Sequence, residues 1–111
     1  MARDKTKPTV RITDPLQDDT YVDLPQLTIH GYARDNNQVA WVKIKIVDAD
    51  TMAVVQNYID ANDITESLSP AWSTWYLDFL FPYAGNYLIK AKAQDLTGNF
   101  SHHDVVIHMQ F

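Results

Sequence analysis

Apolar side chains recur at every second position through most of this 111-residue chain, and that period constrains the fold more than any other feature. Successive side chains of an extended strand point to opposite faces, so alternation indicates a strand with one buried and one solvated face. The segment 26–34 is typical, with Leu27, Ile29 and Ala33 on one parity. Strands of this kind predict antiparallel sheets, each with one wet face.

Seven segments are predicted as strands on this basis: 9–13, 26–34, 39–48, 52–59, 72–81, 87–95 and 101–110. Turn-forming pairs such as Asp14-Pro15 and Gly98-Asn99 separate them. The longest irregular stretch, residues 61–71, contains Asp63-Ile64-Thr65-Glu66, which fits a capping box and predicts a single helical turn. Seven short strands without a long helix predict an all-β, seven-stranded antiparallel sandwich with Greek-key connections.

Length and composition bound the class of protein. The chain has the size of one domain, and we assign residues 1–8 to an N-terminal linker and residues 9–111 to the sandwich. Its net charge of −5 argues against a nucleic-acid partner. The absence of cysteine excludes thiol catalysis, thiolate metal sites and an inter-sheet disulfide. No apolar run reaches membrane-helix length and no leader opens the chain, so we expect any export signal to lie outside this segment.

Four stretches of the sequence resemble bacterial immunoglobulin-like domains, which share their architecture with fibronectin type III and cadherin-like domains. The matching patterns are Pro8-Thr9-Val10-x-Ile12-x-x-Pro15, the run 27–36, the run 39–46, and Gly85-Asn86-Tyr87-x-Ile89-x-Ala91-x-Ala93-x-Asp95-x-x-Gly98-Asn99-x-Ser101. The resemblance implies an immunoglobulin-like sandwich in which the Tyr87 hydroxyl reaches back to the backbone as a tyrosine corner. It also implies a spacer or adhesive role in surface proteins, or an accessory role beside glycan-degrading enzymes.

The histidines and carboxylates do not form a catalytic motif. Three of the four histidines, His102, His103 and His108, lie on or beside the last strand, and no serine sits in a nucleophile-elbow sequence. The acidic residues sit at turns, where they are expected to cap backbone groups. We therefore predict that the chain is not an enzyme and holds no cofactor.

Two turn carboxylates are the best candidates for a metal. Asp35 follows the second predicted strand and Asp95 follows the sixth, and the topology brings those turns to one pole. Calcium takes six to eight oxygen ligands, and cadherin-like domains use carboxylates at such a pole. The alternative is that both side chains cap their own turns.

Two surfaces are candidates for ligand binding. Lys43, Lys45, Lys90 and Lys92 point outward from two strands that are neighbours in such a sandwich, with Trp41 at the edge. They would attract a polyanion such as an acidic glycan, or else serve only to keep a sheet face soluble.

The second surface is aromatic. Tyr32, Trp72 and Tyr76 share the outward parity of the second and fifth predicted strands. Exposed rings suit sugars and protein interfaces alike. In the alternative, Trp72 folds over the edge of the core and the tyrosines cover the sheet beside it.

These observations favour a non-catalytic module of a larger exported or cell-surface protein, acting as a spacer or adhesion unit. An accessory carbohydrate-binding module is the main alternative, and an assembly domain with pairing edge strands is a weaker one. The expected partners are neighbouring domains of the parent chain, a polysaccharide or another surface protein, with no nucleic acid and no membrane insertion.

Overall fold

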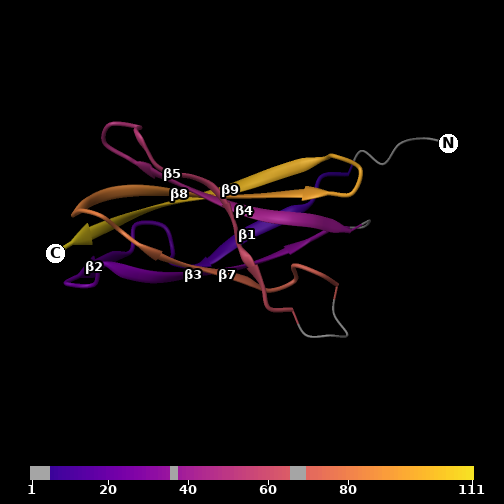
Figure 1. Ribbon diagram of the computed structural model, residues 1–111, viewed down its shortest axis with the longest axis horizontal. Helices are drawn as coiled ribbons and strands as arrows, with labels where there is room; N and C mark the ends of the chain where they lie inside the picture. Colours follow the sequence, from indigo (N-terminus) through magenta and orange to yellow (C-terminus); the bar gives the residue numbers. More distant parts are fainter. Residues whose placement is uncertain (1–5, 36–37, 66–69) are drawn as a thin grey trace.

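A computed structural model, described for residues 6–35, 38–65 and 70–111, shows two β-sheets packed face to face (Figure 1). The four-stranded sheet has the order β1-β3-β7-β6 and the five-stranded sheet the order β2-β9-β8-β4-β5. The strands are β1 Thr9–Asp14, β2 Thr20–Val22, β3 Gln26–Arg34, β4 Val39–Asp48, β5 Val54–Asp60, β6 Asn62–Asp63, β7 Trp75–Leu80, β8 Gly85–Asp95 and β9 Phe100–Gln110.

The all-β sandwich is confirmed, but the described residues form nine strands where seven were predicted. The two additional strands, β2 and β6, have three and two residues, which is too short to show alternation in the sequence. All strand pairs are antiparallel except β2 with β9, which is parallel. After β1 the chain therefore leaves the four-stranded sheet, and the short strand β2 pairs with β9 of the five-stranded sheet.

Strand boundaries follow the regularity of the alternation. The bounds of β3 and β4 are those predicted. β3 alternates along its whole length, whereas β4 alternates from Val42 to Ile46 and has a register shift between Val39 and Trp41 in its pairing with β8. The predicted strand 52–59 begins two residues later, since Met52 adopts a left-handed φ of 62° in the turn before β5. The predicted strand 72–81 likewise begins at Trp75, because Trp72 has a φ of 67° and belongs to a turn.

The helical turn predicted at residues 63–66 is not found in the described part of that segment. Asp63 instead pairs with Trp75 at the end of β6, and its Oδ1 accepts a hydrogen bond of 3.0 Å from the Thr65 amide. The side chain therefore caps a turn after a strand rather than a helix. Glu66 lies outside the described residues.

The core lies between the sheets and consists of the inward parity of each long strand. It includes fully buried Ile29, Ile44, Ile46, Trp75, Tyr87, Ile89 and Ile107. The small residues Ala91 and Ala93 on β8 are also fully buried, so large and small side chains alternate across the interior. Within the described segments, no helix has the length and apolarity needed to cross a bilayer.

A tyrosine corner closes the connection between the sheets, as the resemblance implied. The hydroxyl of buried Tyr87 donates a hydrogen bond to the carbonyl of Tyr83 and accepts one of 3.3 Å from the Tyr83 amide. Its ring packs edge-on against Phe81, with the centroids 4.7 Å apart. This contact fixes the corner between β7 and β8, where the chain passes from one sheet to the other.

Side chains of β9 also join the two sheets along the edge formed by β1 and β9. His103 Nδ1 accepts a hydrogen bond of 2.9 Å from the Ile12 amide, and the Ser101 hydroxyl donates one to the Pro8 carbonyl. Burial lowers the pKa of His103, and the positive charge of Arg11 lowers it further against the opposing effect of Asp104. The neutral imidazole that this favours is the form able to accept from Ile12.

Candidate functional site

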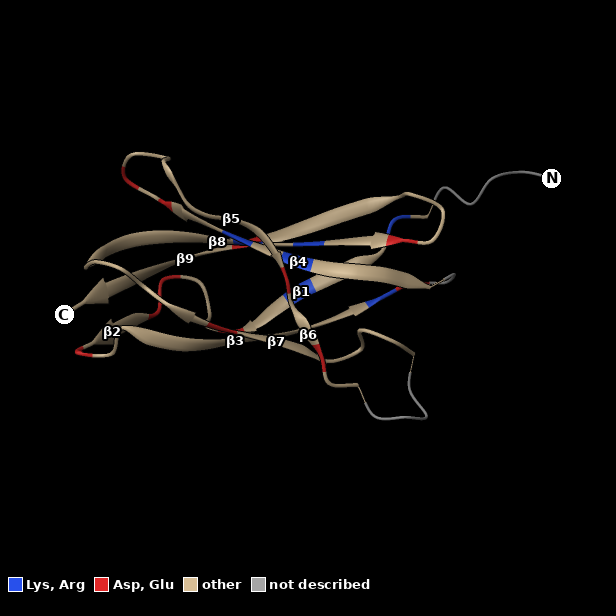
Figure 2. Ribbon diagram, in the orientation of Figure 1, with Lys and Arg blue, Asp and Glu red and all other residues tan. Residues whose placement is uncertain are grey.

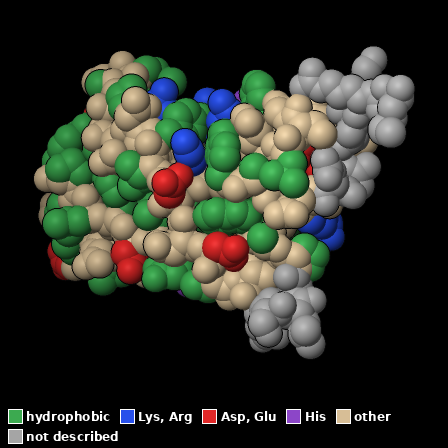
Figure 3. All heavy atoms as spheres, turned by 45° about the vertical axis from the view of Figure 1, so that its right-hand side comes forward, with side chains coloured by type: hydrophobic (Ala, Val, Ile, Leu, Met, Phe, Trp, Pro, Cys, Tyr) green, Lys and Arg blue, Asp and Glu red, His purple; other side chains and the backbone are tan. Residues whose placement is uncertain are grey.

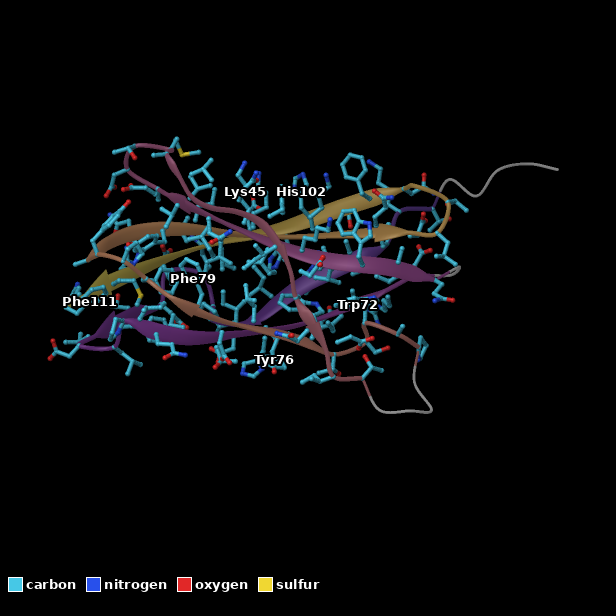
Figure 4. All side chains as sticks on the ribbon, viewed as in Figure 1. Lys45, Trp72, Tyr76, Phe79, His102 and Phe111 are labelled. Atoms are coloured by element: carbon cyan, nitrogen blue, oxygen red, sulfur yellow. The ribbon has the colours of Figure 1, made fainter. Side chains whose placement is uncertain are left out.

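The lysines predicted to form a basic face lie together on the outer side of the five-stranded sheet. Strict alternation places them there, since their neighbours Val42, Ile44 and Ala91 are fully buried. In Figure 2 the basic segments of β4 and β8 lie side by side in the middle of this sheet. Figure 4 places Lys45 and His102 on this outer side and Tyr76 on the opposite side of the molecule.

The register between β4 and β8 sets lysine directly against lysine. Lys43 is the cross-strand partner of Lys92, and Lys45 is the partner of Lys90. Directly opposed side chains lie about 4.5–5.5 Å apart at their β-carbons, and like charges in that position destabilise the sheet. The two pairs are consecutive on one face of the same two strands, so four ammonium groups form a compact grid.

Three aromatic rings flank the grid. The Lys43 ammonium lies 4.8 Å from the ring centroid of Trp41, and the Lys92 ammonium lies 4.4 Å from that of Phe100. Tyr58 of β5 lies between two lysines, with Lys45 and Lys92 each 5.6 Å from its ring centroid. We call the set Trp41, Lys43, Lys45, Tyr58, Lys90, Lys92 and Phe100 the lysine–aromatic face.

The face has few carboxylates. Asp104 of β9 lies 3.9 Å from the Lys90 ammonium and 4.0 Å from His102 Nδ1. Asp60 is the cross-strand partner of Lys43 on the β5 side. Burial raises the pKa of the Tyr58 phenol, and the negative charge of Asp104 raises it further, so the ring stays neutral beside the lysines.

Sequence reasoning found the four lysines and Trp41 but missed Tyr58 and Phe100. Tyr58 was hidden because the β4–β5 register shifts on either side of Ile46, so its facing position does not follow from simple alternation. Phe100 lay just outside the predicted strand 101–110, whereas it is the first residue of β9 and pairs with Gln94. Tyr58 is an aromatic residue in the predicted strand that directly follows the strand carrying Lys43 and Lys45, and this proximity is the signal that could have found it.

The structure does not bring the second predicted surface together as one strip. Tyr32 of β3 and Tyr76 of β7 are half-buried on the four-stranded sheet. Trp72 lies in the turn before β7, where its carbonyl accepts a hydrogen bond of 3.0 Å from Ala33 and its side chain packs against the core. The expected outward parity of Trp72 is therefore wrong, because the residue is not in a strand.

A shallow pocket of about 340 Å³ remains beside Tyr32, lined also by Ala33, Arg34 and Ser73. The Arg34 guanidinium lies 5.4 Å from the Tyr32 ring centroid. A role for Tyr32 or Tyr76 in ligand binding stays a prediction.

The two carboxylates proposed as calcium ligands have different surroundings. Asp95 Oδ1 accepts hydrogen bonds from the amides of Thr97 and Asn99 and from the Thr97 hydroxyl, at 2.8–2.9 Å. Burial would raise the pKa of Asp95, but these hydrogen bonds outweigh it and lower the pKa. Half-buried Asp35 shares a pocket with the cations Lys7 and Arg34, which compete with a metal ion. The described residues contain no group of three or more histidine or acidic side chains placed to hold a metal.

The two facing sheets and the tyrosine corner define an immunoglobulin-like β-sandwich, as the sequence predicted. The fold is similar to CopC from Methylosinus trichosporium OB3b, with a TM-score of 0.60, 17% identity, and 92% of this chain and 94% of that chain covered. It is similar as well to the fibronectin(III)-like modules of CbhA from Clostridium thermocellum, with a TM-score of 0.59, 14% identity, and coverage of 92% and 96%. No protein-family model and no curated protein matches the sequence. At these identities the likeness shows the fold alone.

Proposed function

We propose that this chain is a non-catalytic module of a larger exported or cell-surface protein, acting as a spacer or adhesion unit between neighbouring domains. The observation that supports this most is the path of the chain. The start of β1 lies beside the start of β9, since the Ser101 hydroxyl donates a hydrogen bond to the Pro8 carbonyl. β9 then runs 11 residues to Gln110 at the opposite end (Figure 1). At about 3.3 Å per residue it separates the two ends by roughly 33 Å.

The two poles differ in surface character. We name the end where β1 begins the proximal pole and the end where β9 finishes the distal pole. Most of the exposed large hydrophobic side chains belong to strand ends and turns at the distal pole: Val22, Leu24, Met52, Val54, Leu80, Tyr83 and Phe111. Exposed apolar side chains that gather at one site are typical of interaction surfaces. A distal pole of this kind suits contact with an adjoining domain.

The surroundings of the polar groups support a non-catalytic role. His103 and Asp95 are engaged by backbone amides, as described above. Asp48 accepts hydrogen bonds from the amides of Asp50 and Thr51 in its own turn and from the Tyr83 hydroxyl. Each of these groups stabilises a turn or a sheet edge, which accounts for its presence without chemistry.

An accessory carbohydrate-binding module is the second candidate. The observation in its favour is the lysine–aromatic face, which offers cations and rings on one open sheet surface.

Small-angle scattering of a tandem of two copies tests the spacer role. We expect the longest dimension of the tandem to exceed that of one copy by roughly 33 Å, the rise of β9. Serine substitutions at Val22, Leu24 and Leu80 of the first copy, whose distal pole adjoins the second copy, should loosen the joint. Serine substitutions at Ile64 and Leu96 of the first copy lie at its proximal end, away from the joint, and should leave the longest dimension of the tandem unchanged. A tandem that folds back to nearly the length of one copy would contradict the proposal.

A further inference from the structure

We propose that the lysine–aromatic face binds an acidic polysaccharide, along the strip that crosses β5, β4, β8 and β9. The inference is independent of the spacer role, because it concerns the side of the sandwich and not its poles, and it deepens the carbohydrate-binding candidate by naming the class of polysaccharide. It stands on three features of this face: opposed lysines, an excess of positive charge on an acidic chain, and rings set among the cations.

The opposed lysine pairs destabilise the sheet, and folding alone does not require them. Solubility of an outer sheet face would be met as well by lysine opposite an acidic residue, which also stabilises the strand pair. Here Lys43 faces Lys92 and Lys45 faces Lys90. An anion laid across these pairs neutralises the repulsion, so binding recovers stabilisation that the empty face lacks.

The distribution of charge points to an anionic partner. The chain carries a net charge of −5, yet four of its six lysines lie on this face. The carboxylates beside these four lysines are Asp60 and Asp104, so the face has a local excess of positive charge. A positive patch on an otherwise negative body orients an approaching polyanion toward that patch. Figure 3 shows basic side chains beside hydrophobic ones along this upper side of the molecule.

The rings favour a sugar polymer among polyanions. Lys92 contacts both Tyr58 and Phe100, and Lys43 contacts Trp41, so each flanking ring adjoins a cation. The apolar faces of pyranose rings pack on aromatic rings, and carboxylate or sulfate groups on the same sugars pair with the neighbouring ammonium groups. Two lysines on one strand stand about 6.6 Å apart. Their flexible point charges tolerate the variable spacing of a polysaccharide better than a rigid guanidinium fork does.

A nucleic acid would also be attracted by cations and rings. The face, however, has four lysines and no arginine, while the arginines of the described chain, Arg11 and Arg34, lie on the four-stranded sheet. Arginine is the residue favoured for bidentate phosphate recognition. The observations therefore favour the polysaccharide, and single-stranded DNA becomes the competing probe in the test.

The experiment is affinity electrophoresis and titration calorimetry of the whole chain at low ionic strength. The probes are polygalacturonate for carboxylate, dextran sulfate for sulfate, neutral dextran and single-stranded DNA. We expect binding to polygalacturonate or dextran sulfate that weakens with salt, and no retardation by neutral dextran. The acidic probe that binds more tightly identifies carboxylate or sulfate as the group that the face prefers.

Two variants localise the binding. K43Q/K92Q removes one opposed pair and should weaken binding at least tenfold, an effect of about 1.4 kcal/mol. K7Q/R34Q removes the same charge elsewhere and should change affinity less than twofold, an effect below about 0.4 kcal/mol. Because K43Q/K92Q relieves repulsion, its melting temperature should equal or exceed that of the parent, so weaker binding cannot be attributed to unfolding.

F100A distinguishes a sugar site from charge attraction alone, and should weaken binding severalfold without altering the salt slope. No binding to either acidic polysaccharide would overturn the proposal. Equal losses in K43Q/K92Q and K7Q/R34Q, or tighter binding to single-stranded DNA, would overturn it as well.

Discussion

The ring of Trp75 occupies the space in which a β-carbon on Gly31 would lie. Such a carbon would be 2.2 Å from Cζ2 of Trp75 and 2.2 Å from the backbone carbonyl oxygen of Arg11. The two residues are cross-strand partners in β3 and β7, and Trp75 is fully buried. Glycine is needed at position 31 because an indole on one side and a neighbouring strand on the other leave no room for a side chain.

Replacing Gly31 with alanine should lower the free energy of unfolding by about 1–3 kcal/mol or more, the usual cost of overpacking. The backbone of β1 cannot yield as a flexible side chain would, so relaxation is limited. Urea denaturation followed by tryptophan fluorescence measures the effect. H30A, at an exposed position of the same strand, is the control and should be nearly neutral. Equal midpoints for G31A and H30A would refute this account of Gly31.

Replacing Tyr87 with phenylalanine should cost about 1–2 kcal/mol, because the Tyr83 carbonyl and amide both lose their partner at a half-buried corner. The ring contacts with Phe81 are retained in this variant. Y83F is a matched control, since it removes an exposed hydroxyl that donates a hydrogen bond of 2.9 Å to Asp48. Chemical denaturation should show a clearly larger loss for Y87F than for Y83F. A reversed order would mean that the corner is held by ring packing alone.

The sequence predicted those parts of the molecule in which local pattern and tertiary environment agree. The bounds of β3, and the outward lysines of β4 and β8, follow from regular alternation over a buried face. Trp72 was misplaced because its left-handed backbone conformation places it in the turn before β7, so the strand begins only at Trp75. Tyr58 was missed because a register shift is set by strand pairing, which no single segment encodes.

The opposed lysine pairs could be predicted from the sequence only in part. Alternation showed that each lysine faces outward, but only the register between β4 and β8 shows which residue each one faces. The register depends on contacts distant in sequence, from Val39–Asp95 at one end to Asp48–Tyr87 at the other. The chemistry of the candidate site therefore became visible only in the folded structure.

Replacing Asp95 with asparagine should lower the urea midpoint at neutral pH, because an amide cannot accept all the hydrogen bonds that Thr97 and Asn99 donate. The folded-state pKa of Asp95 is lowered below its ordinary value of 3.8. Its stabilisation is thus present above pH 4 and is lost as the pH falls through the folded-state pKa. The difference between parent and D95N should narrow below pH 4 in acid denaturation profiles. A constant difference down to pH 2 would show that the carboxylate charge is irrelevant.

Calcium should leave the melting temperature unchanged at millimolar concentration. Binding to the native state raises stability with ligand concentration, but Asp95 is already engaged by its turn and Asp35 lies beside Lys7 and Arg34. Differential scanning fluorimetry with calcium and with a chelator measures this. A calcium-dependent rise that disappears in D35N/D95N would instead establish the metal site that the sequence suggested.

Stability should fall by about 1 kcal/mol between pH 7 and pH 5 because of His103, roughly the value of one hydrogen bond. Its folded-state pKa is lowered below 6.5, so the unfolded chain binds the proton more readily. The stabilisation is therefore complete above pH 6.5 and is lost as the pH falls toward the folded-state pKa. H103Q keeps an acceptor for the Ile12 amide but does not titrate, so its urea midpoint should change less over this range. H30Q, at an exposed position on the other sheet, is the matched control for the loss of one histidine. If H103Q follows the parent and H30Q does not, the pH dependence arises elsewhere and the link between β1 and β9 is not its cause.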